Sequence, residues 1–539
     1  MLGYFLTTGL RPAAAALLRR AALACALLGA TAAHALTPAQ ALAMAQGDSD
    51  ARIAAIEAAL ASPTAPLGPY LRAMADDAVV VADGRALVVQ GGQASDPVSG
   101  AAVALPEGAE DVMNNNRLRG EISAALAALD LFAPDTVRRR EAAQAMLKQP
   151  SPERLPLLDR ALAQEKDAQA RQSLELARSA AQLGSSDVLQ RRDAAAALGD
   201  SGSPQARLLL QTRLAEESDE RVQAQLRRSL AQVDDRLAWG ERLGVVFTGI
   251  SLGSILLLVA LGLAITYGLM GVINMAHGEL MMIGAYATYM VQNLFQAYLP
   301  NAFDAYLLAA VPLSFLAAAA VGALMERTVL RFLYGRPLET LLATWGISLV
   351  LMQLVRSLFG AQNVGVENPS WMSGGWQLLP NLTLPLNRLV IIVFAAAVLL
   401  AMAWTIGRTR LGLFVRGVTQ NRAMAACVGV NTARVDTLAF ALGSGVAGLA
   451  GCALSQVGNV GPDLGQSYIV DAFMVVVLGG VGQLLGTVYA ALGLGILGKF
   501  LEGWTGAVLA KIAVLVFIIV FIQKRPQGIF AMKGRSAEA

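Results

Sequence analysis

One stretch of the sequence, Gly262–Tyr286, places polar side chains inside a run that is otherwise apolar enough to lie in a membrane. Asn274, His277 and Glu279 stand close together in it, and we name these three residues the polar cluster. Polar and ionisable side chains are costly in hydrocarbon, so they are retained there mostly where they line a path or pair inside the protein. Three glycines around the cluster are expected to break or bend the helix: Gly268, Gly271 and Gly278. The combination indicates a membrane transporter rather than an anchored enzyme.

The composition agrees with a membrane protein and argues against a nucleic-acid partner. Of the 539 residues, 55% are hydrophobic and 15% are charged, and the net charge is only +3. A soluble chain of this length would carry a larger charged fraction. The three cysteines are far apart and match neither a metal-binding spacing nor a disulfide framework: Cys25, Cys427 and Cys452. We therefore expect inert thiols and no metal site.

Residues 1–35 have the pattern of a signal peptide. Basic residues precede a short apolar run, and the run ends in Ala33-His34-Ala35. A positive segment, a short apolar segment and a small-residue ending are typical of secretory signals, and the run is short for a membrane span. We expect cleavage after Ala35, with an uncleaved anchor as the alternative. The region 36–238 would then be exported.

The exported region begins with an α+β segment, predicted over 36–130. Ala78–Val89 contains two runs with strand-forming residues, joined by Asp83-Gly84. This dipeptide between two such runs is a strong signal of a two-residue hairpin turn. A small β-hairpin is therefore expected here.

An internal repeat follows in the alanine-rich region 131–238. Arg139–Met146 matches Arg191–Leu198 at an offset of 52 residues, and the same offset relates Glu165 to Glu217. Self-similarity at a fixed period indicates stacked helical units. The sequence predicts HEAT-like repeats that bind or brace a partner; a structural cap on the membrane domain is the alternative.

Residues 240–525 form the predicted membrane domain, and 526–539 form a short tail. A helix needs about 20 predominantly apolar residues to cross a bilayer. Eight apolar segments can be placed near 243–265, 272–292, 305–326, 338–359, 387–407, 436–458, 471–498 and 506–523. The predicted fold class is an all-α polytopic membrane protein with about seven or eight apolar segments, one of them re-entrant.

Basic residues predict the orientation of these segments. They concentrate after the third, fifth and last segments, whereas 293–304 and 360–386 carry few charges. Lysine and arginine are enriched in cytoplasmic loops, so the tail is expected in the cytoplasm and 36–238 in the periplasm. Ends on opposite sides require an odd number of crossings, and eight segments cannot all cross once.

The exception is expected at 471–498, which Gly479, Gly480 and Gly482 interrupt. Two half-helices that enter and return on the same face would restore an odd number. Irregular backbone at membrane depth is tolerated where it lines a cavity, and glycine-interrupted segments in transporters point toward the solute path. Close helix packing through small residues is the alternative explanation of these glycines. The first segment, interrupted by the polar cluster, is the alternative place for the break.

Three motifs carry a family resemblance. Ile273–Glu279, which reads INMAHGE, resembles the signature of the branched-chain amino acid class of ABC-transporter permeases. Arg416–Asn431 is similar to a cytoplasmic loop of that family, and Val476–Ala491 is similar to its glycine-rich late motif. The region 36–238 resembles the exported extension of the larger permease subunit of urea ABC importers, including the stretch Asn114–Arg119.

The resemblance implies one subunit of a heteromeric importer in a bacterial inner membrane. Its partners would be a second permease subunit, two ATPase subunits, a periplasmic solute-binding protein and membrane lipid. The ATPase subunits would use the ATP, so this chain is expected to hold no cofactor and no catalytic residue. Gly493–Lys499 has the spacing of a phosphate-binding loop. However, Phe500 stands where that motif has Ser or Thr, and the surrounding run is apolar, which argues against nucleotide binding.

Two groups of residues are candidates for function. The translocation-path candidates are Asn274, His277, Glu279, Gly479, Gly480 and Gly482. The ATPase-coupling candidates are Arg416, Asn421 and Gly429, where a short helix would end at a glycine. Two plainer interpretations remain open: Glu279 pairs with His277 and the trio only caps broken helix ends, and 416–431 is an ordinary basic loop.

The function expected from these features is that of a permease subunit of an ATP-driven urea importer. Urea is neutral and planar, so its path needs hydrogen-bonding groups rather than fixed charge. A branched-chain amino acid permease is the alternative within the same class. A membrane-anchored scaffold or receptor is the alternative from another class.

Overall fold

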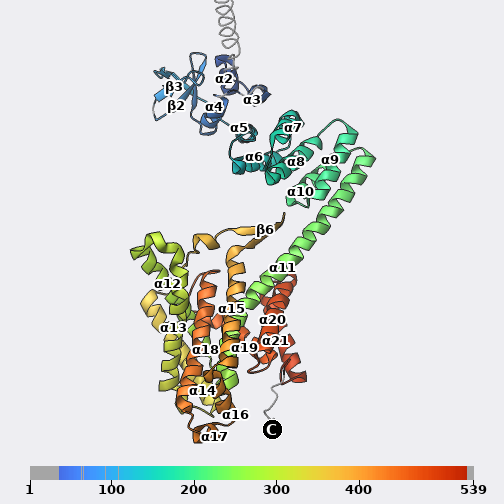
Figure 1. The fold of residues 1–539 in the computed structure, drawn as a ribbon. Coiled ribbons are helices and arrows are strands. Elements are labelled where there is room, and N and C mark those ends of the chain that lie inside the picture. Colours follow the sequence, from blue (N-terminus) through green and yellow to red (C-terminus); the bar gives the residue numbers. More distant parts are fainter. Residues whose placement is uncertain (1–35, 62–63, 65, 92, 107, 531–539) are drawn as a thin grey trace, which may run out of the picture. The chain divides into compact units, whose positions relative to one another are not determined.

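The computed structural model describes residues 36–530 apart from 62–63, 65, 92 and 107. The predicted signal peptide and most of the predicted tail lie outside the described residues. The chain divides into two compact units, Met1–Leu237 (unit 1) and Ala238–Ala539 (unit 2). Helix α11 (Glu220–Met270) contributes to both units (Figure 1). Each unit is described separately below.

Unit 1 begins with a small sheet packed on helices. Five antiparallel strands run in the order β4-β3-β2-β1-β5. They are β1 (Val79–Ala82), β2 (Arg85–Gln90), β3 (Gln93–Ser95), β4 (Ala102–Val103) and β5 (Glu110–Asp111). Asp83 and Gly84 join β1 to β2 with φ values of 52° and 68°, the left-handed backbone that a two-residue primed turn requires. The sheet is therefore larger than the predicted hairpin at its centre.

The helices of unit 1 bury two main apolar clusters, one from α2 to α8 and one around α9, α10 and the start of α11. The first four are α2 (Pro38–Ala45), α3 (Ser49–Ala61), α4 (Leu67–Ala75) and α5 (Asn116–Asp130). The next are α6 (Thr136–Lys148), η1 (Pro152–Arg154), α7 (Leu155–Gln164), α8 (Ala168–Gln182), α9 (Val188–Ser201) and α10 (Pro204–Glu216). Tyr70 and Met74 of α4 lie in the same buried cluster as Ile122 of α5 and Leu174 of α8. The sheet and the first helices thus share a core with α6, α7 and α8.

The 52-residue offset of the sequence recurs in the hydrogen bonds of unit 1. Arg139 Nε donates to Glu165 Oε2 at 2.7 Å, and Arg191 Nε donates to Glu217 Oε2 at 2.9 Å. In both places Nη1 of the arginine donates to two carbonyl oxygens just before its own helix. In both, Oε1 of the glutamate accepts from the next two backbone N–H groups. The two segments therefore share a local fold; their likeness to HEAT repeats stays a prediction.

Unit 2 is a bundle of helices that run between two ends. After α11 come α12 (His277–Tyr298), η2 (Pro300–Ala305), α13 (Tyr306–Thr328), η3 (Leu330–Phe332), α14 (Pro337–Phe359), η4 (Ser370–Met372) and α15 (Leu386–Arg408). The chain continues through α16 (Arg410–Gln420), α17 (Arg422–Cys427), α18 (Thr432–Ser455), α19 (Leu464–Gly479), α20 (Leu484–Thr505) and α21 (Ala507–Lys524). Among the described residues, seven helices are long and apolar enough to span a membrane: α11, α13 with its flanking turns, α14, α15, α18, α20 and α21.

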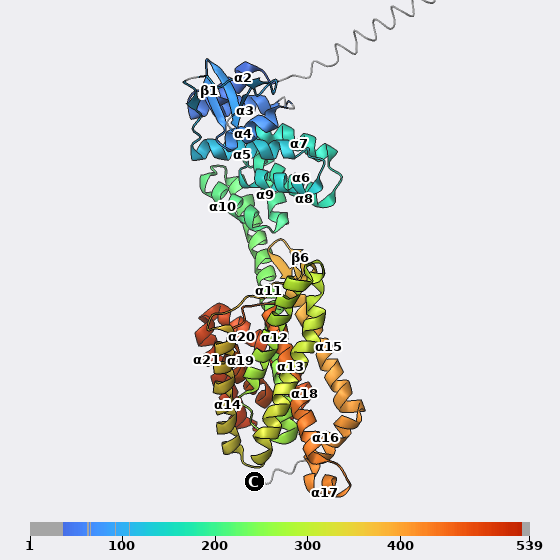
Figure 2. The same cartoon turned by 90° about the vertical axis from the view of Figure 1, so that its left-hand side faces the viewer.

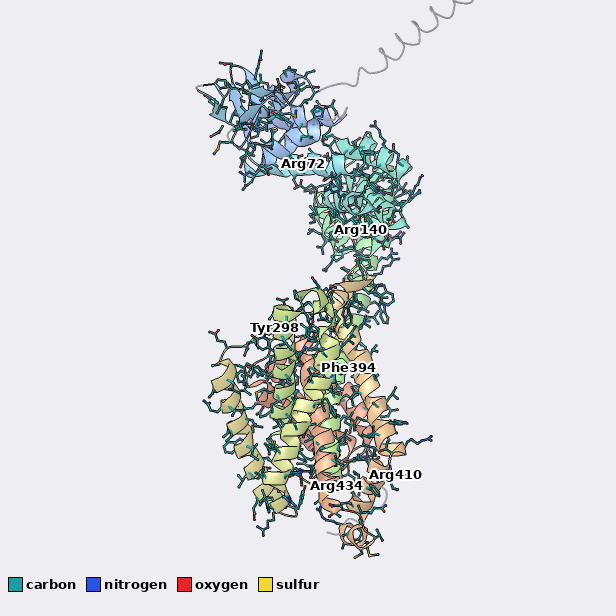
Figure 3. The ribbon with its side chains drawn as sticks, turned by 60° about the vertical axis from the view of Figure 1, so that its left-hand side comes forward. Arg72, Arg140, Tyr298, Phe394, Arg410 and Arg434 are labelled. Atoms are coloured by element: carbon teal, nitrogen blue, oxygen red, sulfur yellow. The ribbon has the colours of Figure 1, made fainter. Side chains whose placement is uncertain are left out.

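The two ends of unit 2 differ in structure. One end, which we name the hairpin end, carries the antiparallel strands β6 (Gly375–Leu379) and β7 (Leu382–Pro385) (Figure 2). The other, which we name the α17 end, carries α16 and α17 (Figures 1 and 2). Tyr298 lies at the hairpin end, and Arg410 and Arg434 lie at the α17 end (Figure 3). The basic residues after the fifth apolar segment thus gather at one end of the bundle.

The predicted re-entrant segment, 471–498, is interrupted in the structure but has a different extent. Helix α19 ends at Gly479 and α20 begins at Leu484, so the break falls among the glycines. However, α19 begins already at Leu464, and α20 continues to Thr505. With its 22 residues and a rise of about 1.5 Å per residue, α20 is long enough to cross a bilayer. The prediction of two half-helices within 471–498 is therefore wrong, because α20 is a full-length helix.

Candidate functional site

The polar cluster lies where the chain reverses direction between α11 and α12. Helix α11 ends at Met270, and Gly271 follows with φ of +66°, a backbone conformation that glycine adopts without steric cost. The side chains of Asn274, His277 and Glu279 are all buried, with exposed fractions of 0 to 1%. The cluster therefore lies in the interior of unit 2.

Local hydrogen bonds hold the turn that leads into α12. Asn274 Oδ1 accepts from the backbone N–H of Ala276 at 3.1 Å, which fixes the backbone just before the helix. His277, the first residue of α12, places Nε2 3.1 Å from the carbonyl oxygen of Val259 on α11. Since a carbonyl oxygen only accepts, Nε2 carries the hydrogen, and in the neutral imidazole Nδ1 is then the unprotonated nitrogen. The imidazole thus bridges the start of α12 to the C-terminal part of α11.

Glu279 pairs with a serine on α14 rather than with His277. The Ser348 hydroxyl donates to Glu279 Oε1 at 2.6 Å, and both side chains are buried. One turn earlier on α14, Thr344 Oγ1 accepts from the backbone N–H of Met275 at 3.2 Å. The interpretation that Glu279 pairs with His277 is therefore wrong. His277 contacts α11, whereas Glu279 is hydrogen-bonded to α14.

Thr344 and Ser348 complete the site and were not among the predicted residues. Both lie on the same face of α14, because residues four apart in a helix stack above one another. Thr340 continues this row, and all three side chains are buried, whereas most large side chains of α14 are exposed. The signal in the sequence is the four-residue spacing of small hydroxyl residues in an otherwise apolar segment.

Three polar atoms of the cluster have no hydrogen-bond partner among the described residues. They are Asn274 Nδ2, His277 Nδ1 and Glu279 Oε2, and each is shielded from solvent. A buried donor or acceptor without a partner costs on the order of 1–3 kcal/mol. Such groups are rare in native proteins, and each calls for an explanation. One donor and two acceptors of the cluster are thus left unsatisfied among the described residues.

Close backbone contacts surround the cluster. A Cβ atom on Gly465, at the start of α19, would lie 2.0 Å from Glu279 Oε2, and one on Gly278 would lie 2.4 Å from the carbonyl oxygen of Gly465. A Cβ atom on Gly262 of α11 would lie 2.9 Å from Cε1 of His277. Side chains at these positions would collide with the cluster. The glycines allow α11, α12 and α19 to meet around it.

The three glycines predicted to line the path lie in tight backbone contacts. A Cβ atom on Gly479 would lie 2.5 Å from the carbonyl carbon of Gly486 across the α19–α20 turn. One on Gly480 would lie 2.3 Å from the carbonyl oxygen of Phe530. Gly482 approaches Gly268 at the end of α11, where an added Cβ would lie 2.4 Å from the Gly482 Cα. These contacts agree with the alternative that the glycines allow close helix packing. A solute path along these residues stays a prediction.

The coupling candidates lie at the α17 end and are exposed. Asn421 caps α17, and its side chain accepts from the N–H of Met424 at 2.9 Å. Gly429 follows the helix with φ of +87°, and a Cβ atom there would meet no atom within 4 Å. Arg416 on α16 donates to the carbonyl oxygen of Ile406 at 2.6 Å. The structure thus has a short capped helix between Asn421 and Gly429.

Exposed apolar side chains accompany these residues. Leu413 and Phe414 on α16 are 60% and 41% exposed, and Met424 and Val428 at α17 are 60% and 75% exposed. Only Ala425 of α17 is buried. A short helix at the end of the bundle therefore presents both apolar and basic groups on its surface.

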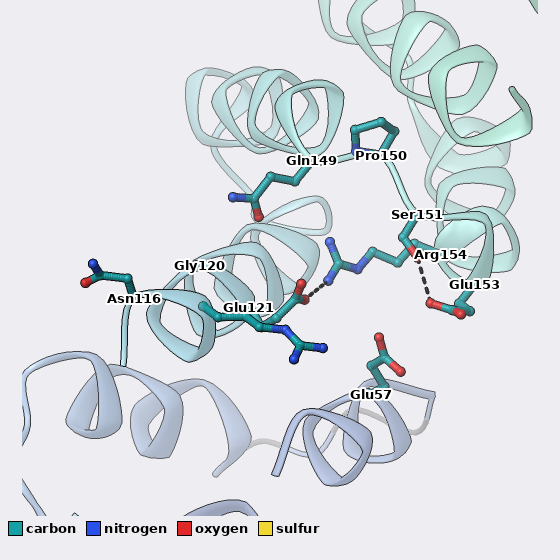
Figure 4. A pocket seen from close by; sticks show the side chains of 10 residues that line it. Glu57, Asn116, Gly120, Glu121, Gln149, Pro150, Ser151, Glu153 and Arg154 are labelled. Atoms are coloured by element: carbon teal, nitrogen blue, oxygen red, sulfur yellow. Dashed lines mark hydrogen bonds and ion pairs between the residues drawn. The ribbon is translucent and has the colours of Figure 1, made fainter. Parts of the chain in front are cut away.

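Unit 1 contains a polar cleft of about 330 Å³ between α3, α5 and η1 (Figure 4). Arg154 Nη2 donates to Glu121 Oε2 at 2.5 Å across it, and Ser151 Oγ donates to Glu153 Oε2 at 2.8 Å. The carboxyl group of Glu57 faces the same space (Figure 4). Its pKa is raised by burial and by the nearby charge of Glu153. The pair between Arg154 and Glu121 fastens η1 to α5.

Comparison with known proteins identifies the class of unit 2. The family described as branched-chain amino acid transport system / permease component matches residues 245–523. The high-affinity branched-chain amino acid transport system permease protein LivH of Escherichia coli (strain K12) is 30% identical over 290 residues, covering 53% of this chain and 94% of that protein. BraD of Pseudomonas aeruginosa, of the same description, is 28% identical over 287 residues, covering 52% and 93%.

A more distant relative transports a different kind of solute. The ribose import permease protein RbsC of Escherichia coli (strain K12) is 29% identical over 146 residues, covering 26% of this chain and 39% of that protein. No solved structure matches the chain. The family match covers more than half of the 539 residues and nearly all of unit 2. The chain therefore belongs to the family of branched-chain amino acid transport system permease components.

Proposed function

We propose that this chain is the permease subunit of an ATP-driven urea importer. Its family membership supports the transport role. The observation that carries the solute path is the polar cluster, where three buried polar atoms lack partners among the described residues. Unit 2 would provide the path, and the segment from Arg416 to Gly429 would couple it to ATP hydrolysis.

The proposed partners follow from the way such importers work. A second permease subunit and two ATPase subunits would complete the transporter, and a periplasmic binding protein would deliver the solute. The ATP would be bound by the ATPase subunits. The exposed apolar side chains of α16 and α17 support docking of an ATPase there, because buried apolar area is the main source of stable association. The chain would lie in the bacterial inner membrane with the α17 end in the cytoplasm and residues 36–238 in the periplasm.

The chemistry of the cluster favours a neutral solute. Urea has a carbonyl acceptor, which the amide Nδ2 of Asn274 would satisfy, and N–H donors, which Glu279 Oε2 and His277 Nδ1 would accept. In the described part of unit 2 no lysine or arginine side chain is buried. A zwitterionic amino acid inside the bundle would leave its carboxylate without a cationic partner, and an unpaired buried charge is costly. The resemblance of region 36–238 to urea importers supports the same solute.

Branched-chain amino acids are the second candidate solute. The observation in their favour is the description of LivH and BraD as branched-chain amino acid permease proteins. The matches to this chain cover 94% and 93% of the lengths of these two relatives. Those relatives match only about half of the chain. Unit 1, for which we propose a role in bracing the complex or docking the binding protein, is what distinguishes this chain from them.

The test is uptake of labelled urea and labelled leucine, each at micromolar concentration, in cells with and without the gene. Urea uptake that disappears with the gene and returns with a plasmid copy supports the proposal. If leucine uptake instead is lost and restored in this way, the proposed solute is wrong, but the proposed permease function stands. If neither uptake depends on the gene, the transport proposal fails and a membrane-anchored scaffold becomes the better explanation. A plasmid copy with Glu279→Gln serves as the site control, because it keeps the size of the side chain but removes the carboxylate.

A further inference from the structure

One arginine connects the exposed helix α17 to the rest of unit 2. Helix α17 has six residues, of which only Ala425 is buried. Arg422, its first residue, donates from Nη2 to Oδ2 of Asp436 in the second turn of α18. Asp436 is buried, with an exposed fraction of 3%. A half-exposed arginine on α17 is therefore anchored to a carboxylate inside the bundle.

The same guanidinium also contacts the turn between α13 and α14. Its Cζ lies 4.9 Å from the centre of the Tyr334 ring, within the range in which a cation is attracted to an aromatic face. The Tyr334 hydroxyl donates to Glu326 Oε1 at 2.9 Å, near the end of α13. Arginine suits this double contact, because its planar group stacks on a ring while its N–H groups reach a carboxylate.

Glu326 also accepts a second hydrogen bond, from α18. The Thr437 hydroxyl on α18 donates to the other oxygen of Glu326, Oε2, at 2.5 Å. Glu326 and Thr437 are both buried, with exposed fractions of 2% and 7%. We name these five residues the helix-end network: Arg422, Asp436, Tyr334, Glu326 and Thr437. It joins α17, α18, α13 and the turn before α14 at the α17 end.

Helix α18 continues this connection to the polar cluster. A Cβ atom on Gly448 of α18 would lie 2.4 Å from the carbonyl oxygen of Ser314 on α13, and one on Gly451 would lie 1.9 Å from the carbonyl oxygen of Met281 on α12. Packing this close leaves no room for α18 to slide against its neighbours without displacing them. Met281 lies two residues after Glu279, in the first turns of α12. The close contacts therefore connect α18 to the helix that carries the cluster.

We propose that Arg422 is the positioning residue that transmits movement of α17 to α18 and α13 through the helix-end network. This inference rests on the proposed function, because it presumes that an ATPase subunit moves α17. It adds a residue that is distinct from Arg416, Asn421 and Gly429, which lie on the exposed surface. Arg422 acts through Asp436 and Tyr334 and touches no solute.

The test uses the complete importer, purified with its ATPase and binding-protein partners and reconstituted in lipid vesicles. Solute uptake and ATP hydrolysis are measured on the same preparation for the wild type, Arg422→Ala and Arg422→Lys. We expect Arg422→Ala to lower the solute taken up per ATP hydrolysed by about 5-fold or more, the range of a coupling between two sites. Arg422→Lys keeps the charge but loses the planar stack, and an intermediate ratio is expected. Its milder change also provides the measurement if Arg422→Ala does not assemble.

A double variant and a matched control separate coupling from folding. If Arg422 acts through Asp436, then adding Asp436→Asn to Arg422→Ala lowers the ratio no further than the single change. The control is Arg331→Ala. Cζ of Arg331 lies 5.8 Å from the centre of the Phe332 ring. Both residues belong to η3, so this contact does not connect different helices. A wild-type ratio of uptake to hydrolysis in both Arg422 variants overturns the inference, as does a parallel loss of both activities. If the wild-type complex itself shows no ATP-dependent uptake, the proposed function fails, and this inference fails with it.

Discussion

Ser348 donates its hydroxyl hydrogen to Glu279 at 2.6 Å and so ties α14 to the first turn of α12. The bond joins two buried groups at Glu279 Oε1, whereas Glu279 Oε2 has no hydrogen-bond partner among the described residues. Helix α14 buries only one row of side chains, at positions 340, 344, 348, 352 and 355. The bond therefore belongs to the narrow face by which α14 is held against the polar cluster.

Ser348→Ala is expected to destabilise unit 2 and to lower uptake. The change leaves Glu279 Oε1 buried without a donor, which costs on the order of 1–3 kcal/mol. Thermal unfolding of the purified chain in detergent measures the loss, and uptake by cells measures the effect on transport. Ser357→Ala is the matched control, because Ser357 is exposed on the same helix and donates only to the carbonyl oxygen of Gln353. Equal stability of the two variants would show that Glu279 does not depend on Ser348.

His277→Leu is expected to abolish most uptake while leaving membrane insertion intact. Leucine has no group to replace the bond to the Val259 carbonyl or the free acceptor at Nδ1, so a polar solute would lose one contact at the cluster. His277→Gln keeps a side-chain donor and acceptor and should retain part of the uptake. The amount of protein in the membrane fraction is measured beside the transport rate. Wild-type uptake by the leucine variant would show that the cluster only shapes the turn before α12.

Gly429→Leu is expected to lower uptake strongly without preventing insertion. A Cβ atom at this position meets nothing within 4 Å, so the cost comes from the backbone φ of +87° alone, roughly 1–2 kcal/mol for a residue other than glycine. That strain would displace the end of α17 from its docking geometry. Gly417→Leu on α16 is the control, since it also has open space around it but lacks the positive φ. Equal uptake by the two variants would show that Gly429 has no special role in ATPase coupling.

Structural features that depend on residues close together in the chain can be predicted from the sequence. The sequence predicts a short helix that ends at a glycine in this region, and the structure has α17 from Arg422 to Cys427, with Asn421 as its cap and Gly429 just after it. The break among Gly479, Gly480 and Gly482 also falls where the residues predict it. In each case the turn or cap depends on chemistry within a few residues.

Pairings between distant segments were not accessible in the same way. Glu279 and His277 lie two residues apart, which makes a local ion pair the obvious expectation. Residues two apart in a helix do not face each other, and the actual partner of Glu279 lies 69 positions away at Ser348. Such a partner depends on how α12 and α14 pack. A single sequence shows only the row of hydroxyl residues on α14, not the helix that it faces.

Gly284→Ala is expected to be far more damaging than its small size suggests. A Cβ atom there would lie 2.2 Å from the carbonyl oxygen of Gly448, a rigid backbone atom where α12 meets α18. Overpacking of this kind costs typically about 1–3 kcal/mol. Gly346→Ala is the control, because a Cβ on this residue of α14 meets nothing within 4 Å. Thermal unfolding in detergent should show a lower midpoint for Gly284→Ala alone. Equal midpoints would mean that α12 and α18 adjust without cost.

Glu217→Gln is expected to destabilise unit 1 in a manner that depends on pH. Burial raises the pKa of Glu217, but hydrogen bonds from Arg191, from the Asp219 N–H and from Arg213 outweigh this effect and lower the pKa from 4.5 to about 2. The native state therefore favours the carboxylate more than the unfolded chain does. Its stabilising effect is complete above about pH 4.5 and is lost as the pH falls toward 2. Hydrogen bonds to a charged group contribute about 1.5–3 kcal/mol, which is the expected loss for Glu217→Gln at pH 7.

Calorimetry of the full chain in detergent, repeated from pH 7 to pH 3, measures this dependence through the unfolding transition of unit 1. The difference in melting temperature between the wild type and Glu217→Gln should be constant down to about pH 4.5 and should shrink below it. Glu216→Gln is the control, because Glu216 is the exposed neighbour of Glu217 on the same turn. Arg191→Ala should remove most of the same pH-dependent difference, since it takes away the donor that holds Glu217 ionised. A difference that stays constant down to pH 3 would mean that the Glu217 carboxylate is not stabilised by its partners.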